Sequence, residues 1–310
     1  MDILLMLPIA VAIDLMFGDP KNALHPVYYM GHVIGFWIKL GAKWGKFWQY
    51  IWGMLVTLFT IVLLTVPFFF IFWWLREAAY PLYIILGGLF LSLFFSVRQL
   101  KNTALAIKKM LDETSLEQAR FELRALVSRN TSKLNKKQLS SAAVESVAES
   151  LCDSVVAPLF FFCLLGFPGI IAYRAVNTAD SMIGYHGQYE YLGKFAAVTD
   201  DVLNFIPARL AMLCIVGAAY LYSQSSAKKA WQIAMRDGKS TSSPNAGYPM
   251  ASMAGALGVQ LEKIDHYKLG DEKCEFDTAV ITKSTKLLYI SSFIWFAVCL
   301  VFGGILFALS

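Results

Sequence analysis

The chain has 310 residues, of which 57% are hydrophobic and 15% aromatic, and its mean hydropathy is +0.54. That much apolar surface excludes a soluble globular protein and indicates an integral membrane protein. The net charge of +5 comes from lysines and arginines that lie between apolar runs, which is typical of cytoplasmic loops and predicts no nucleic-acid partner.

The first apolar run, Ile3–Phe17, is shorter than the roughly 20 residues of a spanning helix and carries Asp14 near its end. Its first residues lack a basic start and a cleavage site, which predicts a retained helix and not a signal peptide. Glycines and prolines then break the segment GDPKNALHPVYYMGHVIG and hold Asp19 and His25 in turns. We predict that Asp14, Asp19 and His25 bind substrate. The alternatives are that Asp14 only reaches interfacial water and that His25 is a structural histidine.

Four further apolar runs predict membrane segments: Ile51–Leu75 and Leu82–Val97, which would form a helical hairpin, and later Phe205–Tyr222 and Leu287–Leu309. Lysines and tryptophans alternate before the first of these runs, as in the belt that precedes a membrane entry. Pro207 is expected in the first turn of its helix. Residues 98–143 predict a polar, helical, cytoplasmic insertion, and residues 224–286 predict a polar loop that contains SPNAG.

The stretch from Ser141 to Arg209 gathers acids and amides around short apolar runs. Three clusters at helical spacing supply the predicted catalytic residues: Glu145, Glu149 and Asp153; Asn177 and Asp180; and Asp200, Asp201 and Asn204. The alternative for the first cluster is the solvated face of an amphipathic helix. Because uncompensated charge beside apolar runs is expensive, the three clusters together favour a magnesium and phosphate site.

Within this stretch, the apolar run Val155–Tyr173 is interrupted by Gly166, Pro168 and Gly169. It is either one kinked span or a re-entrant hairpin, which is tolerated only where it is buried in protein or lines a cavity. We favour the hairpin because it returns Asn177 and Asp180 to the side of Glu145. The following segment, Thr178–Asp201, is expected to be a loop, and its few basic residues favour the opposite side of the membrane.

Candidate phosphate ligands are Arg174, Arg209, Ser243, Asn245 and Gly247. The two arginines lie at the ends of apolar segments, where they could clamp phosphate oxygens or anchor the chain at the membrane surface. The SSPNAGYP segment offers donors but has no established nucleotide-binding pattern, so by itself it reads as a turn before a helix. Small residues follow, which allow a close approach of the backbone to another helix or to a ligand. The five cysteines form no CxxC pair and are interpreted as small hydrophobic residues.

These elements predict an all-α, polytopic integral membrane helical bundle with about 5–6 membrane segments, one of them a candidate re-entrant segment. Residues 1–310 are expected to form a single integral membrane domain, located as a multi-pass protein in the inner cell membrane.

Several motifs together carry a family resemblance: GDP and HPVYYMG, ESVAES with Asp153, VAPLF, YRAVNTADSMIGY, DDVLNFIPARL and SPNAGYPMASMAGALGVQLE. In this order they closely resemble the adenosylcobinamide-phosphate synthase family of cobalamin biosynthesis (CobD/CbiB), over nearly the whole chain. The chain departs from the family pattern at Ser150, where an asparagine is usual, and at Val198 and Thr199, where an arginine often precedes the DD pair.

The resemblance implies a membrane enzyme that joins adenosylcobyric acid to aminopropanol or its phosphate in an amide bond, with ATP and Mg²⁺. Its partners would be the corrinoid, the aminopropanol phosphate and membrane lipid, and a homo-oligomer is a further candidate assembly. Glu149, Asp153, Asp180 and Asp201 are the predicted metal ligands, and His25 or a carboxylate could accept a proton from the incoming amine. The alternatives are a membrane prenyltransferase with an Asp–Mg²⁺–diphosphate site and an ion-coupled transporter.

Overall fold

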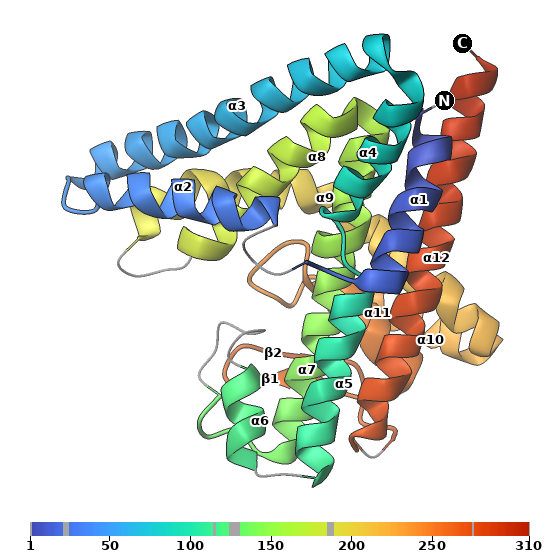
Figure 1. Ribbon diagram of the computed structural model, residues 1–310. Helices are drawn as coiled ribbons and strands as arrows, with labels where there is room; N and C mark the ends of the chain where they lie inside the picture. The colour runs from blue at the N-terminus through green and yellow to red at the C-terminus, as the bar shows by residue number, and fades with distance from the viewer. Residues whose placement is uncertain are drawn as a thin grey trace. The chain divides into compact units, whose positions relative to one another are not determined.

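The computed structural model describes residues 2–20, 25–113, 116–123, 131–184, 189–274 and 276–309 (Figure 1). Among these residues, four helices are long and apolar enough to cross a membrane: Lys46–Ala78, Lys136–Ile183, Glu190–Leu221 and Ala279–Ala308. A shorter apolar helix, Tyr80–Ser92, follows the first of them. The predicted helical membrane fold is therefore confirmed, with one small two-stranded sheet added to it.

Internal contacts divide the chain into two interleaved units, each assembled from distant segments. Unit 1 comprises Met1–Ser96, Ala157–Asn204 and Val298–Ser310, and unit 2 comprises Val97–Val156 and Phe205–Ala297. Both polar segments predicted from the sequence, residues 98–143 and 224–286, belong to unit 2.

The first part of unit 1 contains α1 (Asp2–Phe17), α2 (Pro26–Gly41), α3 (Lys46–Ala78) and α4 (Tyr80–Ser92). The hydroxyls of Tyr80 and Tyr83 donate hydrogen bonds to the Asp2 carboxylate at 3.0 and 2.9 Å, which ties the start of α1 to the start of α4. The predicted hairpin of Ile51–Leu75 and Leu82–Val97 corresponds to α3 and α4, but α4 has 13 residues and ends at Ser92, so the second arm is shorter than predicted. Helix α3 exposes large apolar side chains along much of its length, as expected of a surface in contact with lipid.

The rest of unit 1 is built on α8 (Ala157–Ile183) and the first part of α9 (Glu190–Tyr222). The expected loop Thr178–Asp201 is largely wrong: α8 continues to Ile183 and α9 already begins at Glu190, while residues 185–188 lie outside the described part. Buried residues spaced four apart explain the difference. Ala179 and Ile183 of α8, and Leu192 and Ala196 of α9, belong to apolar clusters that include Ile34 and Ile38 of α2. Helix α2 supplies this partner surface, which the sequence did not reveal. Pro207 lies inside α9 and not in its first turn.

A sharp bend at Gly166 divides α8 into two arms, and Gly166 adopts φ 65° and ψ −149°. The Phe161 carbonyl oxygen lies so close to Gly169 that a Cβ there would overlap it. In a straight helix these two residues, eight positions apart, would be separated by a rise of about 12 Å. The rings of Phe161 and Tyr173, which flank the bend, also stack with their centroids 5.2 Å apart. The chain thus bends sharply at Gly166, as both the hairpin and the kinked-span interpretations allow.

Unit 2 contains α5 (Arg98–Glu113), α6 (Leu116–Leu123), α7 (Lys136–Leu151), a π-helical turn (Cys152–Val156), α10 (Gln224–Asp237), α11 (Gly247–Leu257), β1 (Leu261–Lys263), β2 (Tyr267–Leu269) and most of α12 (Ala279–Ala308). Helices α5 and α6 lie within the segment predicted as a helical insertion, residues 98–143. The expected polar loop of residues 224–286 is wrong, because it folds into two helices and an antiparallel hairpin with Leu261 opposite Leu269. Small residues allow this segment to fold, because they let α11 pack closely on α10. A Cβ at Gly255 would be 2.6 Å from the Lys229 carbonyl oxygen.

The five cysteines are free thiols, as expected.

The bend at Gly166 yields a testable prediction. Its backbone angles fall near a region that only glycine occupies without strain, so Gly166→Ala is expected to destabilise the fold by about 1–3 kcal/mol. The matched control is Gly304→Ala in α12, where a Cβ would meet no described atom within 4 Å. Thermal unfolding of the purified proteins in detergent measures both. Equal midpoints for the two variants would contradict the strained bend.

Candidate functional site

A buried polar network joins α8 to α9 in unit 1. The Asp200 carboxylate accepts hydrogen bonds from the side-chain amides of Asn177, at 3.2 Å, and Asn204, at 2.8 Å. The Tyr173 hydroxyl donates to the Asn204 oxygen at 3.0 Å. Asp200 is 9% exposed and Asn204 3%, so these groups depend on one another in place of water. Three predicted catalytic residues are therefore brought together by direct contacts.

Arg174, His25 and Asp19 form a second, electrostatically linked group in unit 1. The Arg174 guanidinium donates to the Phe94 carbonyl oxygen from Nε (2.9 Å) and Nη2 (2.6 Å). The imidazole of His25 caps α2, because its Nδ1 accepts a hydrogen bond from the Val27 N–H at 3.2 Å. Burial lowers the pKa of His25; the Asp19 carboxylate opposes this and the Arg174 charge adds to it. Because Nδ1 accepts the Val27 N–H, the neutral imidazole carries its proton on Nε2.

The remaining predicted residues of unit 1 lie at separate places. Asp180 is near the end of α8, where its carbonyl oxygen accepts a hydrogen bond from the Gly184 N–H at 2.7 Å and its carboxylate occupies space that a Cβ at Gly184 would need. Asp201 follows Asp200 on α9 and is partly buried. Asp14 is 2% exposed, which does not fit the alternative that it reaches interfacial water.

In unit 2, the Glu145 carboxylate is a buried acceptor and not part of a solvated helix face. It accepts hydrogen bonds from the hydroxyls of Ser141, at 2.7 Å, and Tyr267, at 2.9 Å, and it is 4% exposed. The Ser141 oxygen in turn accepts a hydrogen bond from the Glu262 backbone N–H at 2.9 Å. The β-hairpin is thereby fastened onto α7 through the first acid of the predicted cluster.

The other two acids of that cluster have different surroundings. Glu149, at the end of α7, is exposed, and Asp153 is partly buried within the π-helical turn Cys152–Val156. A π-turn widens the hydrogen-bonding pattern from i+4 to i+5 and changes the direction of the side chains that follow. Glu145, Glu149 and Asp153 therefore do not share one environment.

The predicted phosphate ligands of unit 2 meet around Arg209. Its guanidinium donates to the Asn245 side-chain oxygen at 2.6 Å and to the carbonyl oxygens of Phe205 (2.9 Å) and Pro244 (3.3 Å). It also lies over the rings of Phe205 and Tyr248, at 3.9 and 4.2 Å from their centroids. Much of its hydrogen-bonding capacity thus holds the SPNAG loop in place.

Two further predicted residues complete this loop. The Ser243 hydroxyl accepts a hydrogen bond from the Asn245 N–H at 3.2 Å. Gly247 begins α11 where a Cβ would overlap the Gly238 carbonyl oxygen. Arg209, Ser243, Asn245 and Gly247 are therefore parts of one compact element, as a shared role requires.

A metal ion has no preformed cage of side chains in the described residues: they contain no group of three or more His, Cys, Asp or Glu side chains able to hold one. Of the predicted metal ligands, Glu149 and Asp153 belong to unit 2, and Asp180 and Asp201 to unit 1. Mg²⁺ commonly uses only one or two carboxylates and completes its shell with water and phosphate oxygens.

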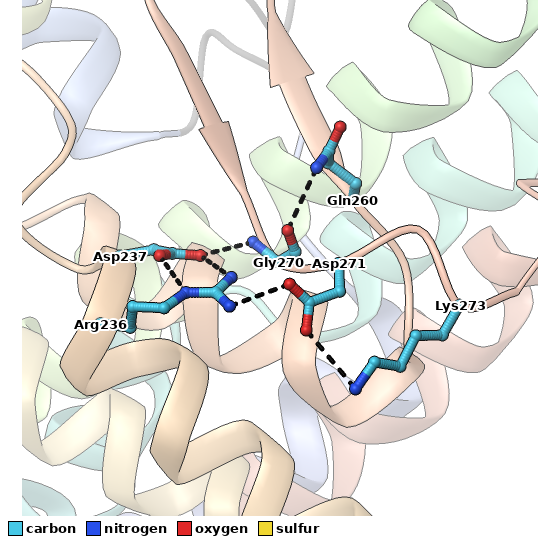
Figure 2. Close-up of polar contacts among 6 residues, drawn as sticks. All are labelled: Arg236, Asp237, Gln260, Gly270, Asp271 and Lys273. Atoms are coloured by element: carbon cyan, nitrogen blue, oxygen red, sulfur yellow. Dashed lines mark hydrogen bonds and ion pairs between the residues drawn. The ribbon is translucent and has the colours of Figure 1, made fainter.

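A further buried carboxylate, not predicted from the sequence, holds the end of α10 against the chain that leaves β2 (Figure 2). Asp237 accepts hydrogen bonds from Arg236 Nε (2.6 Å) and Nη2 (2.8 Å) and from the Gly270 N–H (2.7 Å). Arg236 Nη1 also donates to Asp271 at 2.9 Å, and Lys273 lies 3.5 Å from the same carboxylate. Burial would raise the pKa of Asp237, but the Arg236 and Gly270 hydrogen bonds outweigh it and lower the pKa below the ordinary 3.8.

Sequence reasoning missed Tyr173, Tyr267 and the Arg236–Asp237 pair. Tyr173 directly precedes Arg174 in the YRAVNTAD motif, so its place in that motif could have indicated that it belongs to the site. Tyr267 lies in a three-residue strand, and adjacent residues such as Arg236 and Asp237 do not face each other on a regular helix. Their roles depend on the folded arrangement.

The family described as CobD/Cbib protein matches residues 7–288. The chain belongs to the CobD/Cbib family. It is 51% identical to the cobalamin biosynthesis protein CobD of Dehalococcoides mccartyi over 295 residues, which cover 95% of this chain and 96% of that protein. It is 39% identical to the probable cobalamin biosynthesis protein CobD of Methanothermobacter thermautotrophicus over 282 residues (90% and 91%). No solved structure matches the chain.

The resemblance stated from the motifs is therefore confirmed for this CobD/Cbib protein. Neither the prenyltransferase nor the transporter alternative gains support from these relatives.

The Asp200 network predicts a stability effect at Asn204. Asn204→Leu keeps the approximate shape but removes the donor to Asp200 and the acceptor for Tyr173, so unfolding should become easier by about 1–3 kcal/mol. Val202→Leu is the control, because Val202 is an exposed apolar side chain on the same helix. The midpoints of thermal unfolding in detergent are measured for wild type and both variants. A midpoint for Asn204→Leu that equals that of the wild type would show that the network contributes nothing to stability.

The lowered pKa of Asp237 predicts acid sensitivity. A carboxylate whose pKa is lower in the folded protein contributes stability above its ordinary pKa of 3.8 and loses that contribution as the pH falls through its folded value. Asp237→Asn should therefore be less stable than wild type at pH 7, and the gap should narrow below about pH 4. Asp265→Asn, at the exposed turn of the hairpin, is the control and should match wild type throughout. If the difference in stability between wild type and Asp237→Asn stayed constant from pH 7 to pH 3, the lowered pKa of Asp237 would be contradicted.

Proposed function

We propose that this CobD/Cbib protein is an adenosylcobinamide-phosphate synthase of cobalamin biosynthesis, a multi-pass enzyme of the inner cell membrane. In the proposed reaction, ATP drives formation of an amide bond between adenosylcobyric acid and (R)-1-amino-2-propanol O-phosphate or aminopropanol. The observation that carries this proposal is the family match over residues 7–288, which relatives named as cobalamin biosynthesis proteins support.

The chemistry sets two requirements for such a ligase. A carboxylate is a poor electrophile, so ATP would first convert the corrinoid carboxylate to an acyl phosphate and release ADP. The amine attacks only in its neutral form, so a base must take a proton from the ammonium before the amide forms and phosphate leaves. Charge that develops on the phosphoryl group also has to be stabilised.

The residues of unit 1 suit the proton transfer. His25 uses its one acceptor nitrogen, Nδ1, to cap α2, so it would take a proton there only after release of the Val27 N–H. A carboxylate is the alternative base, and the Asp200 carboxylate, fixed by two amides, can orient an ammonium. We assign Asp14 and Asp19 to substrate binding.

Phosphate recognition in this proposal uses arginines and the SPNAG loop. Arg174 lies close enough to affect the pKa of His25 and would place phosphate oxygens next to the base. The Arg209, Ser243, Asn245 and Gly247 group of unit 2 would line a phosphate. Mg²⁺, when bound, would neutralise phosphate charge, and either Glu149 and Asp153 of unit 2 or Asp180 and Asp201 of unit 1 would hold it.

The proposed reaction predicts that the purified protein consumes ATP only when a corrinoid acid and an amino alcohol phosphate are both present. Phosphate release and formation of the amide product are measured together, with each substrate omitted in turn. ATP consumption that is independent of both substrates would refute the ligase assignment, and corrinoid uptake into vesicles without ATP use would favour a transporter.

Variants test the residues separately from the reaction. Glu149→Ala and Asp180→Ala are each expected to reduce amide formation about 10²-fold, the usual scale for loss of one electrostatic contact to a transferring group. Glu117→Ala, at an exposed position on α6, should leave the rate unchanged. Wild-type rates in both site variants would show the site assignment to be wrong even if the reaction itself is confirmed.

A further inference from the structure

One face of α10 lines a small cavity in unit 2 that none of the roles above uses. Lys229, Gln232, Ile233 and Arg236, at i, i+3, i+4 and i+7, share that face. The opposite wall is formed by α11 and the turn after it, and the chain that follows β2 closes the rim. The cavity has a volume of about 130 Å³.

Positive charge dominates the lining. Lys229, Arg236 and Lys273 face one carboxylate, that of Asp271. This carboxylate is already held by Arg236 at 2.9 Å and by Lys273 at 3.5 Å. Among the described residues, Lys229 has no carboxylate partner within 4 Å. Because Arg236 also pairs with Asp237, one positive charge remains in excess, which favours an anion in the cavity.

Arg236 is fixed before any ligand enters. Its contacts with Asp237 and Asp271 use three of the five N–H donors of a guanidinium (Figure 2). The planar group is therefore held in one orientation, with donor capacity that those three bonds do not use. A preorganised guanidinium loses little conformational freedom when it binds an oxyanion.

Glycines keep side chains off the opposite wall. Gly258 ends α11 in the left-handed conformation, φ 70°, and Gly255 brings α11 against the α10 backbone. Both line the cavity, so part of its surface is bare backbone. The run of small residues noted in the sequence thus serves helix contact and also leaves this space open.

The volume limits what can bind. A water molecule takes up about 30 Å³ of liquid, so the cavity holds a few waters or one tetrahedral oxyanion. Pockets for larger ligands are typically about 300–1,000 Å³, which excludes a whole nucleotide or corrin ring. We infer that this cavity binds a single phosphate group. On the proposed function, that group belongs either to the amino alcohol phosphate or to ATP.

Direct binding of inorganic phosphate to the purified full chain tests the inference without any turnover. Calorimetric titration in detergent, with chloride at matched ionic strength as the reference, should show saturable binding to wild type. Lys229→Gln should weaken it roughly tenfold, because a hydrogen bond to a charged group contributes about that much. Lys228→Gln changes the neighbouring exposed lysine, which does not line the cavity, and should bind as wild type does.

Lys273→Gln is a second lining variant that keeps the test decisive if Lys229→Gln does not fold. Equal affinity in wild type and a folded lining variant, or no saturable binding beyond the chloride reference, would overturn the inference.

Competition identifies the source of the phosphate. Displacement of bound phosphate by (R)-1-amino-2-propanol O-phosphate assigns the site to the amine donor, and displacement by ATP assigns it to the nucleotide. Displacement by neither would overturn the link between this cavity and the proposed reaction. Because phosphate binding is measured without a corrinoid, a negative ligase assay would leave the binding result standing.

Discussion

Buried carboxylates that must find partners inside the protein determine how the helices of this chain are connected. An apolar environment supplies no water to a charged oxygen, so each such group needs donors from the chain itself. Asp200, Glu145 and Asp237 each accept two or more hydrogen bonds, and in each case at least one donor comes from a different element. These contacts join α8 to α9, α7 to the β-hairpin, and α10 to the chain after β2.

The same constraint separates structural acids from those available for chemistry. Glu145 has both carboxylate oxygens in hydrogen bonds with hydroxyl groups, which suits a residue that fastens the hairpin onto α7. Glu149, one turn later, is exposed and can reach a ligand that comes from solution. Asp200 accepts hydrogen bonds from two neutral amides, which orient its carboxylate. A site for an ammonium or a metal–phosphate complex needs both an oriented carboxylate and a carboxylate that a ligand can reach.

The spanning helices could be predicted from the sequence because hydropathy over about 20 residues reports directly on the membrane. The bend at Gly166 was also visible, since glycine and proline interrupt an apolar run. Spacing found Asn177, Asp200 and Asn204 because they lie on facing helices at intervals of about one turn. Helix α2 and the hairpin with Tyr267 were missed because their burial depends on partners far away in the sequence, which local periodicity does not contain.

A ligase that uses ATP and an amino alcohol phosphate handles two phosphate-bearing substrates, so it needs positive charge at more than one place. Arg209 and Lys229 meet that need differently. Arg209 uses several donors on the SPNAG loop and is stacked between two rings, so it shapes a phosphate-binding loop as much as it contacts phosphate. Lys229 lies in a cavity with excess positive charge and has no described carboxylate partner, so its charge is available to a ligand. A change at Arg209 should therefore disturb loop structure and binding together, whereas a change at Lys229 should separate binding from stability.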